Sequence, residues 1–224
     1  MRKSKFIILF FSLCYLFSAG LYGQDYYEKK IDSLKQVIKE NPENAFAHNS
    51  LGIYYFELKR YPEAISSHKE AIRIDPEDAR AHVFLGSCYY ALKRYSEAIS
   101  SHKEGIRIDP EDARAHLFLG SCYYALKRYS EAISSYKEAI RIDPEDARSH
   151  VFLGSCYYDL KRYLEAISSY KEAIRIEPED ARAHVALGIT YLTIGNKGMA
   201  LDQYKILKEL DKDLANQLFD IIYE

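Results

Sequence analysis

The sequence repeats itself with a period of 34 residues. Residues 79–112 and residues 113–146 differ at only three positions, and residues 147–180 form a third close copy. Residues 45–78 and 181–214 are looser copies in the same register. A unit of this length cannot bury its own apolar surface, whereas stacked neighbours bury a continuous core. The period therefore predicts an array of small stacked units, and it argues against one or two globular domains.

Each repeat predicts two helices joined by a short turn. Residues 113–126 carry Leu119 and Tyr123 on one helical face, and residues 130–142 carry a second apolar stripe at helical spacing. A Lys-Arg pair interrupts the pattern between the two stripes. Pro144 follows the second stripe, and a proline there ends a helix because it lacks a backbone donor and restricts the preceding residue. The predicted unit is a helix-turn-helix.

The residue types at fixed positions of the repeat resemble the pattern of the tetratricopeptide repeat (TPR) family. That family's pattern is matched in the third repeat by Leu119, Gly120, Tyr123, Ala132, Tyr136, Ala139 and Pro144. The resemblance covers residues 45–214. It implies an all-α fold, a right-handed superhelical solenoid of helix-turn-helix repeats, and peptide binding on the concave face built by the first helices.

The domain organisation follows from this register. The segments are a signal peptide or uncleaved anchor (1–23), an N-terminal capping helix (24–44), five repeats (45–78, 79–112, 113–146, 147–180 and 181–214) and a C-terminal capping helix (215–224). Terminal helices of this kind cover the ends of a stack. The last helix carries Phe219, Ile221 and Ile222, which leaves a homodimer through it open.

Several residues depart from the family pattern. The fourth position of every repeat is a histidine where a large aromatic residue is usual, and Gly105 replaces an alanine inside a helix at a cost of about 1 kcal/mol. The turn between the helices is Lys-Arg in four repeats, and only Gly195-Asn196 matches the usual glycine followed by Asp or Asn. We therefore expect weak capping of the second helices in the first four repeats.

The N-terminus predicts export. Residues 1–5 are basic, residues 6–17 are apolar, and small residues follow before Gln24. A membrane-spanning helix needs about 20 apolar residues, whereas the core of a secretory signal needs about 7–15. The expected location is therefore exported, periplasmic or secreted. An uncleaved anchor in the inner membrane is the alternative, and membrane contact is expected only in that case.

One stripe of the first helix has no packing partner within its own repeat, although it is strongly apolar. Such a stripe is either covered by neighbours or exposed as a binding surface. Gap-filling between neighbouring repeats is the alternative to a groove. By the family resemblance, the groove would be lined by Arg80, Val83, Phe84, Ser87, Tyr90, Arg114, Leu117, Phe118, Ser121, Tyr124, Arg148, Val151, Phe152, Ser155, Tyr158 and Arg182.

The lining residues indicate what kind of ligand is expected. Chaperone-tail clamps of the family grip a terminal carboxylate with lysines and asparagines, and here those positions hold Val83, Phe84 and Ser87. Acidic residues precede each groove arginine and are expected to neutralise it. We therefore expect a scaffold or adaptor that binds an apolar or aromatic peptide segment or helix. The alternatives are a membrane-tethered assembly factor and a regulatory subunit of an envelope enzyme.

Other functions find no support in the sequence. A formal net charge of -2 gives no basic field for nucleic acid. No nucleotide loop, metalloprotease helix, nucleophile elbow or dinucleotide fingerprint is present. Reactive side chains recur in nearly identical repeats, whereas an active site is a single constellation. We expect no enzyme activity and no cofactor.

Histidines and cysteines also recur at fixed repeat positions. Equivalent positions in adjacent repeats lie about 10 Å apart, too far to share a metal ion, so packing histidines and no metal site are expected. Cys88, Cys122 and Cys156 are expected to be buried free thiols, since stacked repeats hold them too far apart for disulfides. Free thiols argue against an oxidising compartment, and so against export.

Overall fold

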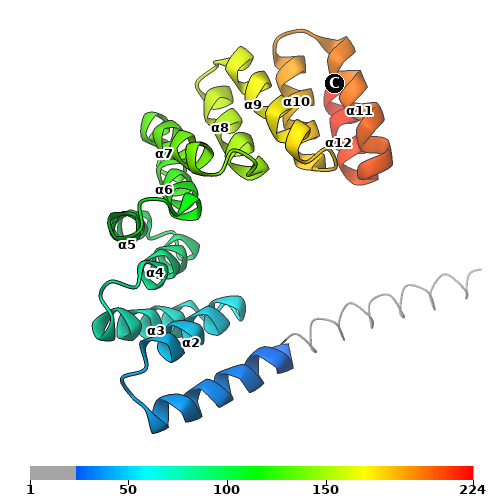
Figure 1. The fold of residues 1–224 in the computed structure, drawn as a ribbon. Coiled ribbons are helices and arrows are strands. Elements are labelled where there is room, and N and C mark those ends of the chain that lie inside the picture. The colour runs from blue at the N-terminus through cyan, green and yellow to red at the C-terminus, as the bar shows by residue number, and fades with distance from the viewer. Residues whose placement is uncertain (1–23, 224) are drawn as a thin grey trace, which may run out of the picture. The chain divides into compact units, whose positions relative to one another are not determined.

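The computed structural model describes residues 24–223, and the predicted signal segment lies outside them (Figure 1). Every regular element in the described range is a helix. After a helical segment at residues 24–40, the helices are α2 (Ala45–Glu57), α3 (Tyr61–Ile74), α4 (Ala79–Ala91), α5 (Tyr95–Ile108), α6 (Ala113–Ala125), α7 (Tyr129–Ile142), α8 (Ala147–Asp159), α9 (Tyr163–Ile176), α10 (Ala181–Thr193), α11 (Lys197–Leu210) and α12 (Lys212–Tyr223).

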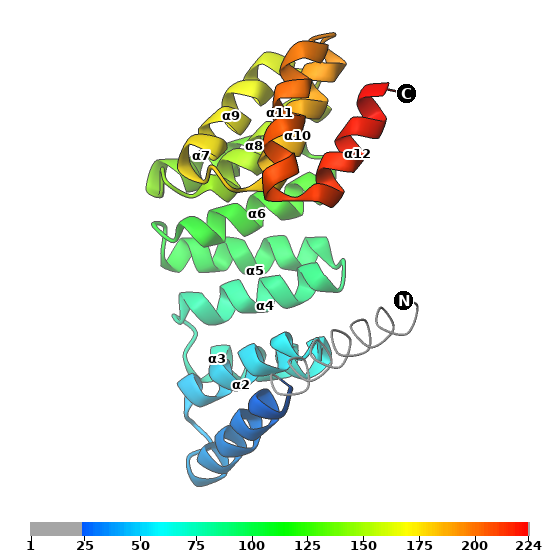
Figure 2. The same ribbon diagram turned by 90° about the vertical axis from the view of Figure 1, so that its right-hand side faces the viewer.

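The helices form two compact units, one ending at Ile108 and the other beginning at Asp109. In the first unit, α2 pairs with α3 and α4 pairs with α5, while α3 packs against α4. In the second unit the pairs are α6 with α7, α8 with α9 and α10 with α11, and α12 packs against both α10 and α11 (Figure 2). Each 34-residue range therefore holds one helix pair, which confirms the predicted all-α fold of stacked helix-turn-helix repeats.

Aspartates and histidines fix the start of the first helices. The side chains of Asp78, Asp112 and Asp180 each accept the backbone N–H two residues further on, at 3.0–3.1 Å. These carboxylates satisfy donors that would otherwise have no partner in the first helical turn. The histidine Nε2 atoms lie 2.9–3.2 Å from the carbonyl oxygen of the proline six residues earlier, at His48, His82, His116, His150 and His184. The unusual histidines thus tie each first helix to the turn before it.

The turn between the two helices uses a lysine where glycine is usual. Lys127 has φ 57°, and its N–H donates to the carbonyl of Tyr124 at 2.8 Å. The N–H of Arg128 donates to the carbonyl of Tyr123 at 2.9 Å. These two hydrogen bonds form the Schellman motif at the end of α6, in which the left-handed residue is usually glycine. Lys59, Lys93 and Lys161 take the same conformation, and Gly195 does so in the fifth repeat.

The second helices α3, α7 and α9, each of which follows a Lys-Arg turn, begin without a side-chain cap. The residues before α3, α7 and α9 are Arg60, Arg128 and Arg162, and none of them forms a capping hydrogen bond through its side chain. Before α11, in contrast, Asn196 accepts the N–H of Met199 at 3.2 Å. The predicted weak capping is therefore found. Each of the three arginines instead stacks over a tyrosine, 4.6 Å from the ring centre.

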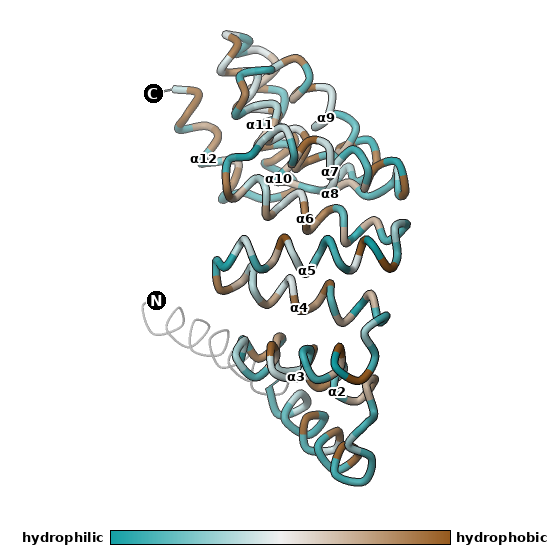
Figure 3. Tube along the Cα trace, turned by 90° about the vertical axis from the view of Figure 1, so that its left-hand side faces the viewer, coloured by the Kyte–Doolittle hydropathy of each residue, from teal (hydrophilic) through white to brown (hydrophobic). Residues whose placement is uncertain are grey.

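Small residues let the helices approach closely in the core. Ala115 and Cys122 of α6 are fully buried. A Cβ atom added at Gly120 would lie 2.6 Å from the ring of Tyr136, so the ring occupies the space that a larger residue would need. Hydrophobic positions are spread along all the helices (Figure 3). Among the helices of the described residues, none has the length and apolar character that a membrane crossing requires.

The C-terminal helix α12 begins at Lys212, before the predicted start at residue 215. It buries Ala215, Leu218 and Ile222, and Leu218 lies over Gly188 of α10. Phe219, Ile221 and Tyr223 of the same helix remain exposed. The homodimer through this helix stays a prediction.

Candidate functional site

The first helices expose one narrow stripe. In α8 it consists of Arg148, Phe152, Ser155 and Asp159, which fall within a sector of about 60° at the usual 100° per residue. We call these positions, and their equivalents in the other first helices, the outer stripe. In the second unit they are Arg114, Phe118, Ser121 and Ala125 of α6, and Arg182, Ala186, Ile189 and Thr193 of α10. In the first unit α4 supplies Arg80, Phe84, Ser87 and Ala91.

Two predicted groove residues are in the core instead. Val83 is 6% exposed and Leu117 is 3% exposed, so neither lines a surface, and that part of the prediction is wrong. Both side chains are buried because they point toward the second helix of the same repeat. A Cβ atom added at Gly105 of α5 would lie only 2.7 Å from a methyl group of Val83. The equivalent Val151 is half-buried.

The stripe phenylalanines belong partly to the joints between repeats. The ring of Phe84 stacks on His68 at 5.7 Å between centres, with the planes 8° apart. In the second unit, Phe152 stacks on Tyr136 at 5.7 Å and 16°. Phe152 nevertheless remains 38% exposed. Gap-filling and surface lining, which the sequence left as alternatives, are therefore both present in the same residue.

The stripe serines are engaged with their own helices. The hydroxyls of Ser87, Ser121 and Ser155 each donate to the carbonyl four residues earlier, at 3.0–3.1 Å. In the second unit, Ser121 and Ser155 also accept from the hydroxyls of Tyr136 and Tyr170, both at 3.3 Å. Their polar atoms thus stabilise the repeat, and they present a small side chain to the surface.

The predicted groove tyrosines link consecutive first helices within the second unit. The hydroxyl of Tyr124 in α6 donates to Asp159 of α8 at 2.8 Å. The hydroxyl of Tyr158 in α8 lies 3.1 Å from that of Thr193 in α10. In the first unit, Tyr90 is 40% exposed and meets Tyr95 edge-on. These tyrosines lie beside the outer stripe rather than along its centre.

Sequence reasoning missed Asp159. The signal was present, because the otherwise similar second and third repeats hold Ala91 and Ala125 at this position. Burial, and then the hydrogen bond to Asp159, raise the pKa of the Tyr124 phenol well above its usual range. The phenol therefore stays protonated and donates to the carboxylate.

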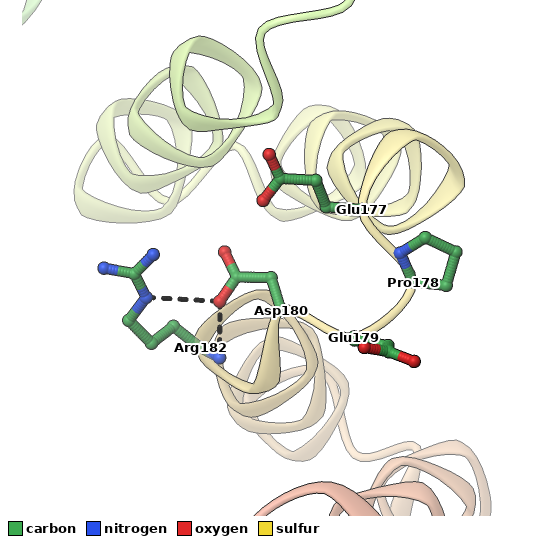
Figure 4. Close-up of a pocket in the computed structure, with 5 residues that line it drawn as sticks. All are labelled: Glu177, Pro178, Glu179, Asp180 and Arg182. Atoms are coloured by element: carbon green, nitrogen blue, oxygen red, sulfur yellow. Dashed lines mark hydrogen bonds and ion pairs between the residues drawn. The ribbon is translucent and has the colours of Figure 1, made fainter.

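The arginines at the start of the stripe are already neutralised, as expected. Their Nε atoms lie 2.9–3.6 Å from the aspartate two residues earlier, at Arg80, Arg114, Arg148 and Arg182. Around Arg182 this pair borders a shallow hollow, with Asp180 held by both the backbone N–H and Nε of the arginine (Figure 4). Glu177, Pro178 and Glu179 line the rest of the hollow. This end of the stripe offers no uncompensated positive charge.

Clustered metal ligands and exposed thiols are absent from the described residues. Within residues 24–223, no group of three or more histidine, cysteine or acidic side chains is placed to hold a metal ion. Cys88, Cys122 and Cys156 are buried free thiols, as predicted, and burial raises the pKa of each to about 12. Such thiols are weak nucleophiles at neutral pH. The outer stripe offers aromatic faces, methyl groups and a carboxylate.

Comparison with known families identifies the repeat. Models described as TPR repeat or tetratricopeptide repeat match residues 55–101, 86–127, 113–146 and 154–195. Among curated proteins, no sequence matches the chain.

Solved structures share the fold. The chain is similar to YrrB, a TPR protein with an unusual peptide-binding site, at 21% identity over 85% of this chain and 99% of that one, with a TM-score of 0.67. It is similar to pilF of Pseudomonas aeruginosa at 20% identity over 89% and 97% of the two chains, with a TM-score of 0.74. It is similar to the thermophilic TPR protein TTC0263 of Thermus thermophilus at 26% identity over 80% of this chain and 100% of that one, with a TM-score of 0.64. The chain belongs to the tetratricopeptide repeat family.

Proposed function

We propose that the chain is a non-catalytic scaffold that binds a peptide segment of a partner protein along the outer stripe of α6, α8 and α10. TPR proteins bind protein or peptide partners, and YrrB, which shares the fold, has a peptide-binding site. The observation that carries the proposal is Phe152, a phenylalanine that stays 38% exposed although it stacks on Tyr136. Because its ring is already held by this stacking, Phe152 offers apolar surface to a ligand and loses little conformational entropy on binding.

The chemistry of the stripe favours an apolar or aromatic segment. The arginines Arg114, Arg148 and Arg182 are paired with aspartates, and the hydroxyls of Ser121 and Ser155 are engaged within the repeat. Apart from the carboxylate of Asp159, ring faces and aliphatic carbons remain for a ligand to cover, so binding gains mainly from removing apolar surface from water. The first unit carries the same features in α4.

The proposal includes an exported location. Its support is the basic segment 1–5 followed by the apolar segment 6–17, both outside the described residues. Cleavage between residues 20 and 24 fits the small residues there. The intact mass of the protein recovered from cells reports this directly. Loss of the first 20 to 24 residues supports export, and a full-length mass contradicts cleavage.

Affinity capture with two matched variants tests the binding surface. Phe152→Ser removes the exposed ring on α8, and Leu164→Ser removes the 74% exposed leucine on the second helix α9. We expect the parent and Leu164→Ser to retain the same partner, and Phe152→Ser to lose it. Circular dichroism and a thermal melt show whether each variant is folded, because Phe152 also packs against Tyr136. Equal capture by the parent and both folded variants would contradict the proposal.

A further inference from the structure

The outer stripe of α8 ends in a carboxylate that the neighbouring repeats lack. Asp159 is exposed and lies four residues after Ser155, on the same face of the helix. The equivalent residues are Ala125 in α6 and Thr193 in α10. Within the second unit, Asp159 is thus the one acidic group on the outer stripe among the described residues.

A phenol from the preceding repeat donates a hydrogen bond to this carboxylate, and a second phenol ring packs against the first. The hydroxyl of Tyr124 donates to Asp159 Oδ2 at 2.8 Å, which fixes the direction of the carboxylate toward α6. Tyr129 of α7 meets Tyr124 edge-on at 5.7 Å between ring centres. Burial, and then the charge of Asp159, raise the pKa of Tyr129.

The charge of Asp159 has no counterion in the part of the chain that the structure describes. Each aspartate at the start of α6, α8 and α10 forms an ion pair with the arginine two residues later. Asp159 instead accepts a hydrogen bond from a neutral phenol. Its negative charge is therefore oriented but not compensated.

We infer that Asp159, with the Tyr124–Tyr129 ring pair, binds a lysine or arginine side chain of the peptide whose apolar residue covers Phe152. This inference rests on the proposed function and specifies its ligand. A cation gains from a carboxylate in a charge-assisted hydrogen bond and from the faces of adjacent aromatic rings. The two contact points are seven residues apart on α8, or about 10 Å at 1.5 Å per residue. An extended peptide covers that distance in about three residues.

Selection from a displayed library of random 12-residue peptides tests the inference on the purified full chain. The same selection is run on two variants. Asp159→Asn removes the charge and keeps an acceptor for Tyr124, and Asp159→Ala gives α8 the residue that α4 and α6 already carry. Because alanine is native at the equivalent positions, loss of folding is not expected for that variant.

We expect the parent to select peptides with a basic residue about three positions from an apolar one. Both variants should keep the apolar residue and lose the basic one. For a selected peptide, replacing its lysine with norleucine should weaken binding about three- to ten-fold on the parent and have little effect on Asp159→Asn, measured by calorimetry.

The other outcomes separate the two ideas. Selection of apolar peptides without a basic residue, or an unchanged basic preference on both variants, would overturn the inference and leave the proposed function standing. A parent that selects no peptide would overturn both. Sedimentation measurements test whether a second copy of the chain occupies the subsite instead. A parent that is dimeric and an Asp159→Asn variant that is monomeric would assign the subsite to the second copy and overturn the peptide assignment.

Discussion

His68 is a fully buried imidazole at the joint between the first two repeats. Its ring stacks on Phe84, and its Nδ1 atom lies 2.8 Å from Asn49 Oδ1. The amide of Asn49 in turn donates to Asp78 at 3.1 Å. Burial lowers the pKa of His68 to about 4, and the charge of Asp78 opposes that shift only in part. The ring is therefore neutral in the folded protein at any pH well above 4.

This histidine predicts acid sensitivity. In the unfolded chain the imidazole takes up a proton below about pH 6.5, whereas the folded ring does so only near pH 4. The stability that depends on the neutral ring is complete above pH 6.5 and is lost as the pH falls toward 4, by an amount on the order of 3 kcal/mol. Urea unfolding of the parent and of His68→Phe at pH 7.5 and pH 5 measures the difference. A parent that loses no more stability than His68→Phe over this interval would contradict the expected role of the buried ring.

At the residue scale, the sequence predicted the type of contact more often than its direction. It placed the histidines and cysteines in packing positions, which is confirmed for the three cysteines and for His68, His102 and His184. The fourth-position histidines of the first four repeats are only half-buried and bond to the preceding turn. It assigned Val83 and Leu117 to a surface, and they are buried. The reason is that a shift of one residue turns a side chain by about 100° around a helix, and adjacent stripes differ little in composition. The free-energy cost that the sequence predicted for Gly105 in a helix also left out Val83, whose methyl group fills the space of the missing Cβ.

At the scale of an element, the turn between paired helices shows a local conflict between sequence and geometry. Lys127 has φ 57° and closes the end of α6 with the hydrogen bond pattern that favours glycine. A side chain in that region costs about 1–2 kcal/mol, which the helix pair tolerates because its packing determines the turn. The stacking of Arg128 on Tyr123 and its ion pair with Glu131 follow directly after this lysine.

Lys127→Gly should therefore stabilise the protein by about 1 kcal/mol, because glycine adopts this conformation without strain. The matched control is Lys137→Gly, at an exposed position inside α7, which should cost about 1 kcal/mol. Urea unfolding of both variants beside the parent measures the two effects. If both substitutions destabilise equally, the backbone at Lys127 is not strained in the way described.

The elements themselves could largely be predicted. Proline after the second helices of the first four repeats, apolar residues at helical spacing and the 34-residue period located every helix pair. The start of α12 was placed three residues late, since Lys212 and Asp213 show no apolar signal. The left-handed lysines could not be foreseen, because the family pattern places glycine there and nothing in the lysine itself favours that conformation.

At the scale of the whole molecule, the first and second helices differ in the surface that they offer to a partner. Both units present an arginine, a phenylalanine and a serine on the outer stripe, on α4 in the first unit and on α6 and α8 in the second. The second helices instead expose ion pairs such as Arg141 with Glu138 and Glu111. Exposed pairs of this kind contribute little binding energy. The sequence predicted this division between the two sets of helices. It could not predict that Phe152 is shared between the joint and the surface, because that depends on how consecutive repeats pack.

The most direct test of the binding surface is site-specific photo-crosslinking in cells. A benzoylphenylalanine residue replaces either Phe152 on the outer stripe of α8 or Leu164 on α9, and both positions are exposed in the structure. We predict a crosslinked partner from position 152 and none from position 164. A partner crosslinked from position 164 and not from position 152 would contradict the proposed function, and would place the binding surface on the second helices.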